Sequence, residues 1–156
     1  MRIDRFDLAL LQALQQDSHL TNAELGNRIS LSPSQVSRRI QRLEAEGVIG
    51  GYAAWLRPQA LGLGLQAFVR VQLEKHGQHT MEPFAQAVQD WDEVVACHAL
   101  TGDMDYLLHV VVPDLDRFSA FLLDKLLNSA GVADVNSSFV LRTVKQTGAM
   151  PLAHLA

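Results

Sequence analysis

Polar side chains between Leu31 and Leu43 are the residues of this sequence best suited to contact a nucleic acid. At about 100° per residue in a helix, Val36, Ile40 and Leu43 fall on one narrow stripe, which the pattern assigns to the interior. The opposite arc offers hydroxyl, amide and guanidinium groups, which pair with base edges and phosphates in the major groove. The predicted DNA-binding residues are Ser34, Gln35, Ser37, Arg38, Arg39, Gln41 and Arg42.

Arg39 lies closest to the apolar stripe, so a phosphate contact and a structural pairing with Glu24 or Glu44 are both open. A solvated charged face is the alternative for the whole arc, because most exposed helices carry charge. Two observations favour DNA contact. No acidic residue lies between Leu25 and Leu43, and the helix start presents free N–H groups and the positive end of its dipole.

Two helix-start signatures and one further helix position this arginine-bearing segment. Each start has a hydroxyl residue followed three positions later by Glu or Gln, which is the pattern of a capping box. The pairs are Thr21 with Glu24 and Ser32 with Gln35. A third helix from Asp4 to Gln16 turns apolar side chains inward. Residues 1–51 are therefore predicted to form a three-helix, winged-type helix-turn-helix head.

The pattern then changes from helices to strands. Val48–Leu56 is predicted as a strand, and residues 52–64 as strand and linker, because Pro58 and the nearby glycines mark a joint. Residues 65–156 carry six alternating or amphipathic segments. The expected elements are a strand at Leu65–Glu74, a helix at about Thr80–Trp91, a hairpin of Val94–Leu100 and Tyr106–Val112, a helix at Leu115–Leu127 and a strand at about Val132–Val144.

This order of elements is that of a ferredoxin-like βαββαβ domain, so the whole chain is predicted to have an α+β fold. Both faces of the central hairpin are apolar. Both helices are expected to cover one face of the sheet, and a second subunit the other.

Composition excludes several classes of protein. The formal net charge of the 156 residues is -4, and the arginines of residues 1–51 are balanced by carboxylates, so affinity for DNA must come from the placement of charge. Cys97 is the single cysteine, which excludes a disulfide framework or a cysteine zinc site and favours a cytoplasmic location. The N-terminus lacks the pattern of a signal peptide, and no segment approaches the roughly twenty apolar residues of a membrane span.

No catalytic, cofactor or metal motif stands out. His76 and His79 have a spacing compatible with a metal, but their polar loop offers no third ligand, so a solvated loop is favoured. We therefore expect no enzyme activity, no cofactor and no membrane partner.

Three segments, SPSQVSRRIQRLEAEGVI, CHALTGDMDYLLHVVVPD and VNSSFVLRTVKQT, resemble the Lrp/AsnC family of bacterial and archaeal regulators. The resemblance covers essentially the whole chain. It implies a transcription regulator that binds double-stranded DNA, forms homodimers through its body sheets, commonly assembles into octamers and responds to an amino acid. The tail MPLAHLA is similar to a subgroup that includes regulators of branched-chain or sulfur amino-acid metabolism.

In this family the effector lies between dimers, against the loop that joins the middle strands and against the last strand. The resemblance implies an effector site of Ala99, Leu100, Thr101, Gly102, Asp103, Asp105, Ser138, Phe139 and Val140. A turn containing Gly102 offers N–H donors to a carboxylate, and Asp103 or Asp105 an acceptor to an ammonium group. Leu100 and Phe139 suit an aliphatic side chain. A plain hairpin turn is the alternative for Gly102 and the two aspartates.

The main alternative function is enzymatic. Tetrapyrrole-processing, siroheme-type decarboxylases resemble this family and would use basic residues of the body to hold substrate carboxylates. Such an enzyme has no need of Ser34, Gln35, Arg38 and Arg42 on one helix face, so the sequence favours the regulator.

Overall fold

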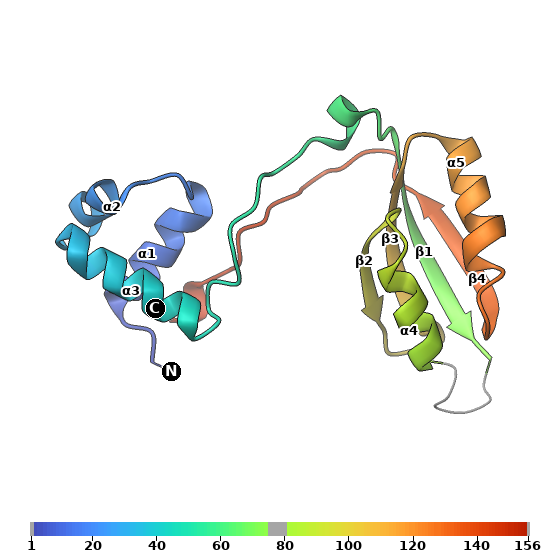
Figure 1. Ribbon diagram of the computed structural model, residues 1–156, viewed down its shortest axis with the longest axis horizontal. Coiled ribbons are helices and arrows are strands. Elements are labelled where there is room, and N and C mark those ends of the chain that lie inside the picture. Colours follow the sequence, from blue (N-terminus) through green and yellow to red (C-terminus); the bar gives the residue numbers. More distant parts are fainter. Residues whose placement is uncertain (1, 75–80, 156) are drawn as a thin grey trace. The chain divides into compact units, whose positions relative to one another are not determined.

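The computed structural model describes residues 2–74 and 81–155, which form two compact units (Figure 1). The first unit consists of Met1–Trp55 together with Lys145–Ala156, and the second of Leu56–Val144. This division differs from the predicted boundaries at the tail, because residues from Lys145 onward pack with the helices of the first unit.

The first unit is built around three helices, α1 (Arg5–Gln16), α2 (Asn22–Ile29) and α3 (Pro33–Ala45). The predicted capping boxes are confirmed, since the side chains of Thr21 and Ser32 accept hydrogen bonds from the N–H groups of Glu24 and Gln35. Asp4 caps α1 in the same way. The core of the unit consists of Leu10, Ala13, Leu25 and Val36.

The turn between α2 and α3 depends on a glycine. A Cβ atom on Gly26 would lie 2.4 Å from the Leu31 carbonyl oxygen, closer than atoms approach in folded proteins. The Leu31 N–H also donates to the Gly26 carbonyl at 3.0 Å. Only glycine allows this tight approach, which fixes where α3 starts relative to α2.

The predicted strand at Val48–Leu56 is wrong. The N–H groups of Val48 and Ile49 both donate to the Leu43 carbonyl, at 2.9 and 3.1 Å, which closes the end of α3. The residues that follow run up to the short 3₁₀ turn η1 (Pro58–Leu61) without joining a sheet in the described part of the chain. Alternation alone does not make a strand, because a strand needs a hydrogen-bonded neighbour.

The second unit is a four-stranded antiparallel sheet in the order β2-β3-β1-β4 (Figure 1). The strands are β1 (Leu65–Leu73), β2 (Val94–Ala99), β3 (Tyr106–Val112) and β4 (Val132–Phe139). The helices are α4 (Met81–Gln89) and α5 (Leu115–Ala120), which continues as the π-helical turn η2 (Phe121–Leu126), and a 3₁₀ turn η3 (Ala153–Leu155) lies in the tail. This strand order confirms the predicted ferredoxin-like domain.

Two predicted elements are too long. β4 ends at Phe139 instead of Val144, because its partner β1 begins at Leu65 and the last bond runs from the Val140 N–H to the Gln66 carbonyl. Leu141 beyond it is 98% exposed. Helix α4 ends at Gln89 instead of Trp91, and the predicted cap Thr80 lies outside the described residues.

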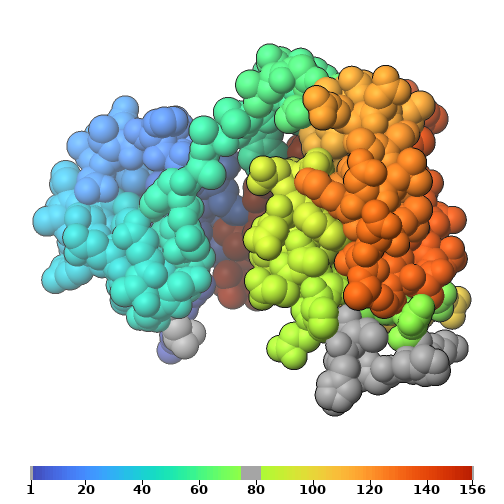
Figure 2. All heavy atoms as spheres, turned by 45° about the vertical axis from the view of Figure 1, so that its right-hand side comes forward, coloured from blue at the N-terminus to red at the C-terminus, as the bar shows by residue number. Residues whose placement is uncertain are grey.

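Both helices cover the same face of the sheet, as predicted, and Figure 2 shows α4 and the α5 segment side by side. Phe84 of α4 and Phe118 and Phe121 of the α5 segment are buried against β1 and β3. The aromatic rings contact one another, with Phe84 and Tyr106 centroids 5.0 Å apart. Among the described residues, no helix has both the length and the apolar character needed to span a membrane.

The opposite face of the sheet, called here the outer face, carries Gln66, Phe68 and Arg70 of β1 and Leu107 and His109 of β3. Phe68 is 41% exposed and stacks on His109 with ring centroids 4.7 Å apart. The His109 ring also hydrogen-bonds the Gln66 side chain at 3.1 Å. An exposed phenylalanine stacked on a half-buried histidine in the middle of a sheet face is typical of a surface that becomes covered.

His109 makes the stability of the second unit depend on pH. Burial lowers the pKa of the His109 imidazole in the folded protein below its ordinary value near 6.5. As the pH falls, the unfolded chain therefore takes up a proton at this residue before the folded chain does. The free energy of unfolding of the second unit is therefore highest above pH 6.5, and it falls as the pH drops toward the pKa of His109 in the folded protein. We expect His109→Phe, which keeps a ring against Phe68, to weaken this dependence in melting curves recorded from about pH 7.5 to about pH 5.5. If the variant lost as much Tm at acid pH as the parent protein does, this role of His109 would be contradicted.

Candidate DNA-binding and effector sites

The outer side of α3 is exposed as the periodicity predicts. Val36 and Leu43 are fully buried at 0% exposure. Ser37 and Arg39 are partly buried at the margin. The exposed residues of the predicted set are Ser34, Gln35, Arg38, Gln41 and Arg42. The helix therefore presents one polar side away from the core of its unit.

The capping box at the start of α3 determines what Gln35 still offers to a partner. The Gln35 side-chain oxygen accepts hydrogen bonds from the Ser32 N–H at 2.9 Å and the Ser32 hydroxyl at 3.0 Å. The hydroxyls of Ser32 and Ser34 lie 3.1 Å apart. The cap uses the amide oxygen of Gln35, so its NH₂ group is the part of the side chain that remains to donate to a partner.

Arg39 and Arg42 bind carboxylates of α1 and its cap. Arg39 Nη1 donates to Asp4 Oδ2 and to Asp7 Oδ1, both at 2.7 Å, and Arg42 Nη2 donates to Asp7 Oδ2 at 2.5 Å. The predicted partners of Arg39, Glu24 and Glu44, are wrong. Glu44 accepts a bond from the Tyr52 hydroxyl at 3.0 Å instead.

The three arginines of α3 are thus not equivalent. Arg38 has no ion-pair partner within residues 2–74 and 81–155, and its side chain is exposed. The pKa of Asp4 falls to about 2, chiefly because the Asp7 N–H donates to its carboxylate and further because Arg39 lies beside it. Arg38 is therefore the guanidinium of α3 most available to DNA.

Asp7 is a buried charged residue whose contacts with α3 the sequence pattern did not reveal. It is fully buried, with 0% exposure, and both of its oxygens face guanidinium groups. A signal was present, because Asp7 lies three and four positions before Leu10 and Leu11 and so on the inward side of α1. A charged residue on an inward side requires a partner.

The hairpin loop between β2 and β3 contains most of the predicted effector residues. The Leu100 N–H donates to the Asp105 carbonyl at 2.8 Å, and Gly102 adopts a φ of 107°, which favours glycine. Thr101, Gly102 and Asp103 are exposed. Ala99 closes β2 opposite Tyr106.

The two aspartates of this loop have different environments. The Asp105 carboxylate accepts the Leu73 N–H at 2.7 Å, and the Asp105 N–H donates to the Val71 carbonyl at 2.9 Å. Asp105 therefore fastens the loop to the end of β1. The Asp103 backbone carbonyl accepts a hydrogen bond from Gln72 Nε2 at 3.1 Å, and Asp103 is an exposed residue. Of the two, Asp103 is the one whose carboxylate is open to a ligand.

The remaining predicted effector residues lie at the end of β4. Ser138 is paired with Phe68 and Phe139 with Ala67 of β1. Phe139 is 45% exposed and packs edge-on against Phe118, with centroids 5.0 Å apart.

A single chain does not bring the two halves of the predicted effector site together. The loop is tied to Leu73 at one end of β1, and Phe139 faces Ala67 near the other end. At about 3.3 Å per residue, six residues of strand separate them by roughly 20 Å. A ligand that touches both halves must therefore lie between two copies of the chain.

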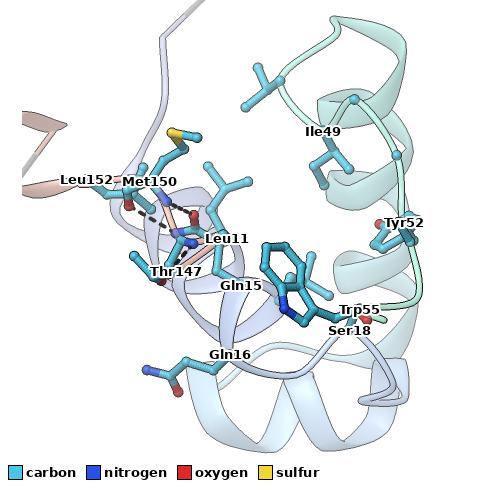
Figure 3. Close-up of a pocket in the computed structure, with 17 residues that line it drawn as sticks. Leu11, Gln15, Gln16, Ser18, Ile49, Tyr52, Trp55, Thr147, Met150 and Leu152 are labelled. Atoms are coloured by element: carbon cyan, nitrogen blue, oxygen red, sulfur yellow. Dashed lines mark hydrogen bonds between the residues drawn. The ribbon is translucent and has the colours of Figure 1, made fainter. Parts of the chain in front are cut away.

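A cavity of about 710 Å³ lies within the first unit, between α1, the residues after α3 and the tail (Figure 3). Gln15 Nε2 donates to the Met150 carbonyl at 3.3 Å, and the Met150 N–H donates to Gln15 Oε1. Gly148 lies under the Trp55 ring, which a Cβ atom would approach to 3.2 Å. These contacts hold the tail on the head.

No group of three or more potential metal ligands occurs among the residues that the structure describes. His76 and His79 lie outside that range.

A helix-turn-helix unit with an exposed polar side on α3, joined to a ferredoxin-like sheet domain, is the architecture of a DNA-binding protein with a second, separate domain. Residues 3–49 match the winged helix-turn-helix DNA-binding family, and residues 66–150 match the Lrp/AsnC ligand binding domain. The chain belongs to the Lrp/AsnC family of transcription regulators.

Three relatives illustrate this likeness. The leucine-responsive regulatory protein of Escherichia coli is 39% identical over 93% of this chain and 88% of its own length. A transcriptional regulator of Neisseria meningitidis, solved as a complex with L-Met, is 48% identical, covers 98% of this chain and 99% of its own, and superposes with a TM-score of 0.94. An AsnC family regulator of Agrobacterium tumefaciens is 35% identical with the same coverages and a TM-score of 0.91. The decarboxylase alternative is set aside, because the family and these relatives are regulators.

Proposed function

We propose that this transcription regulator contacts DNA through the exposed side of α3 and responds to methionine through a site shared between two sheet domains. The DNA contact rests on Ser34, Gln35 and Arg38, which are exposed on one side of a capped helix. The choice of methionine rests on the bound amino acid of the 48% identical Neisseria meningitidis regulator.

The chemistry of the effector loop fits a zwitterion. Exposed backbone N–H groups around Gly102 suit the carboxylate, and the open carboxylate of Asp103 suits the ammonium group. Leu100 and Phe139 are 41% and 45% exposed, and together they offer an apolar surface to an unbranched thioether side chain. Leucine is the second candidate, because several relatives are leucine-responsive.

The observation that carries this proposal is the separation of the two halves along β1. Because loop and β4 lie roughly 20 Å apart in one chain, a ligand bound to both links two chains. The binding free energy of such a ligand favours one assembly of chains over the others. In this way an amino acid controls how the DNA-binding heads are arranged.

We further propose that the outer face of the sheet forms the homodimer and that dimers assemble to an octamer. Phe68 and His109 stack in the middle of an otherwise uncovered face, and Leu107 lies beside them. A second copy laid on this face would remove these rings from water. Pairs of heads also compensate for the lack of net positive charge in residues 1–51, through simultaneous binding to one duplex.

A thermal-shift series tests the effector. L-methionine at about 100 times its dissociation constant should stabilise the native protein by about 2.7 kcal/mol, a rise of several degrees in Tm, whereas D-methionine should give far less. Asp103→Asn is expected to remove most of this rise while leaving the ligand-free Tm unchanged, because the Asp103 side chain is exposed.

Asp105 is unsuitable for this test, since its carboxylate holds the Leu73 N–H and its loss would disturb the fold itself. The proposal fails if L-methionine and L-leucine both leave Tm unmoved, or if Asp103→Asn responds as the parent protein does.

A further inference from the structure

A buried carboxylate joins the first helix of the head to the helix proposed to contact DNA. Asp7 is 0% exposed, and each of its oxygens receives a different guanidinium, Arg39 on Oδ1 and Arg42 on Oδ2. The Asp4 N–H also donates to Asp7 Oδ2 at 3.1 Å. Within the described residues, no buried side-chain nitrogen or oxygen is left without a hydrogen-bond partner.

The charges of this cluster cancel. Asp4 and Asp7 are three positions apart on one side of α1 and its cap, and Arg39 and Arg42 are three positions apart on one side of α3. Two carboxylates therefore face two guanidinium groups across the helix contact. The Phe6 ring lies under Arg39 at 5.3 Å and adds a cation–π contact. Of the three arginines on α3, only Arg38 keeps its charge free for DNA.

We propose that Asp7 is a positioning residue for DNA recognition, which holds Arg39 and Arg42 on α1 and so makes binding selective for sequence. This inference rests on α3 as the DNA-contacting helix. Free guanidinium groups bind phosphates of any sequence, and each adds to affinity for all duplexes alike. By holding two of these groups, Asp7 keeps the affinity for DNA of arbitrary sequence low. Discrimination between sequences is then left to Ser34, Gln35 and Arg38.

The same contact fixes the rotation of α3 about its own axis. Bonds to both oxygens of a buried carboxylate hold Arg39 and Arg42, one turn apart, toward α1. A rotation of α3 that carried both arginines toward DNA phosphates would leave the Asp7 charge buried and unpaired, which is strongly unfavourable. The base-contacting side of α3 is thereby held outward.

Asp7→Asn in the full-length protein tests the proposal, because it removes the charge and keeps the shape. Affinity is measured over a range of salt concentrations, for a duplex from the protein's own upstream region and for a scrambled duplex of equal length and composition. We expect affinity for the scrambled duplex to rise about three- to tenfold. The plot of log affinity against log salt should steepen by about one to two, as one or two freed arginines reach phosphates.

Affinity for the upstream duplex should not rise with it, because α3 loses the contact that fixes its rotation. The specificity ratio between the two duplexes should therefore fall by about three- to tenfold. Asp116→Asn, which removes an exposed carboxylate of the second unit, is the matched control for net charge and should leave the ratio unchanged. If the ion pairs of Asp7 only stabilised the head, the opposite result would be expected. Both affinities would then fall together in Asp7→Asn, with an unchanged ratio and salt slope, and that result would overturn the proposal.

A second pair of variants decides the matter if Asp7→Asn fails to fold. Arg38→Gln should lower the salt slope by about one, whereas Arg42→Gln should lower it by less than half as much, because Asp7 already occupies Arg42. Equal losses in the two variants would contradict the positioning role of Asp7. No loss in either would instead contradict DNA contact through α3, which is a separate failure.

Discussion

Replacing Arg38 with alanine should weaken binding to a specific duplex by about 10- to 100-fold while changing Tm by less than about 2 °C. Arg38 is exposed and has no ion-pair partner within the described residues, so its removal costs the folded head little. In the groove of a duplex, a guanidinium that contacts a base or phosphate contributes about 1–3 kcal/mol, which corresponds to this range of affinity. Fluorescence anisotropy with a labelled duplex measures the effect.

Arg117→Ala is the control for this variant, because Arg117 is an exposed arginine of α5 in the second unit. The two variants carry the same change in net charge. If the Arg117 variant lost as much affinity as the Arg38 variant, the DNA contact would be a matter of bulk charge and not of α3.

Replacing Phe84 with alanine should destabilise the second unit by about 3–5 kcal/mol. Phe84 is 0% exposed and lies between the rings of Trp91 and Tyr106, at centroid distances of 6.0 and 5.0 Å. A domain of this size has a total stability of about 5–15 kcal/mol, so the loss is a large part of the whole. Urea unfolding of the full-length protein measures it.

Leu123→Ala provides the comparison, because Leu123 lies in η2, the other helical segment on this face of the sheet, but is 58% exposed. We expect it to cost less than about 1 kcal/mol. Similar losses in the two variants would show that the core does not lie between α4 and the sheet. In Phe84→Ala, response to the amino acid should be lost along with the sheet domain.

Local periodicity was sufficient to predict the elements that carry the two sites. The side of α3 that is buried follows from the spacing of Val36 and Leu43, because a helix repeats every 3.6 residues whatever surrounds it. The strand Tyr106–Val112 has the bounds that its apolar pattern predicts. Capping boxes are equally local, since donor and acceptor lie three residues apart.

Features that depend on distant residues were missed. The partners of Arg39 and Arg42 lie 32–35 positions earlier in the chain, and no local pattern relates these positions. The false strand at Val48–Leu56 and the premature end of β4 have a common cause. Both depend on whether a neighbouring strand is present to share hydrogen bonds, which alternation does not report.

The effector site shows the same limit in another form. The family resemblance gave the loop and the strand, but only the register of β1 with β4 shows that these lie at opposite ends of the sheet. Likewise, only the hydrogen bond to Leu73 separates the structural role of Asp105 from the open carboxylate of Asp103.

Site-specific cross-linking shows directly whether the exposed side of α3 contacts DNA. A photoactivated cross-linker is attached to Arg38→Cys or to Glu46→Cys, each in a Cys97→Ser background, and the protein is irradiated on its own upstream duplex. The two positions are exposed and lie about 12 Å apart along the direction of α3. We expect strong cross-linking to DNA from position 38 and little from position 46. Equal yields from both positions, or none from position 38, would contradict DNA contact through the exposed side of α3.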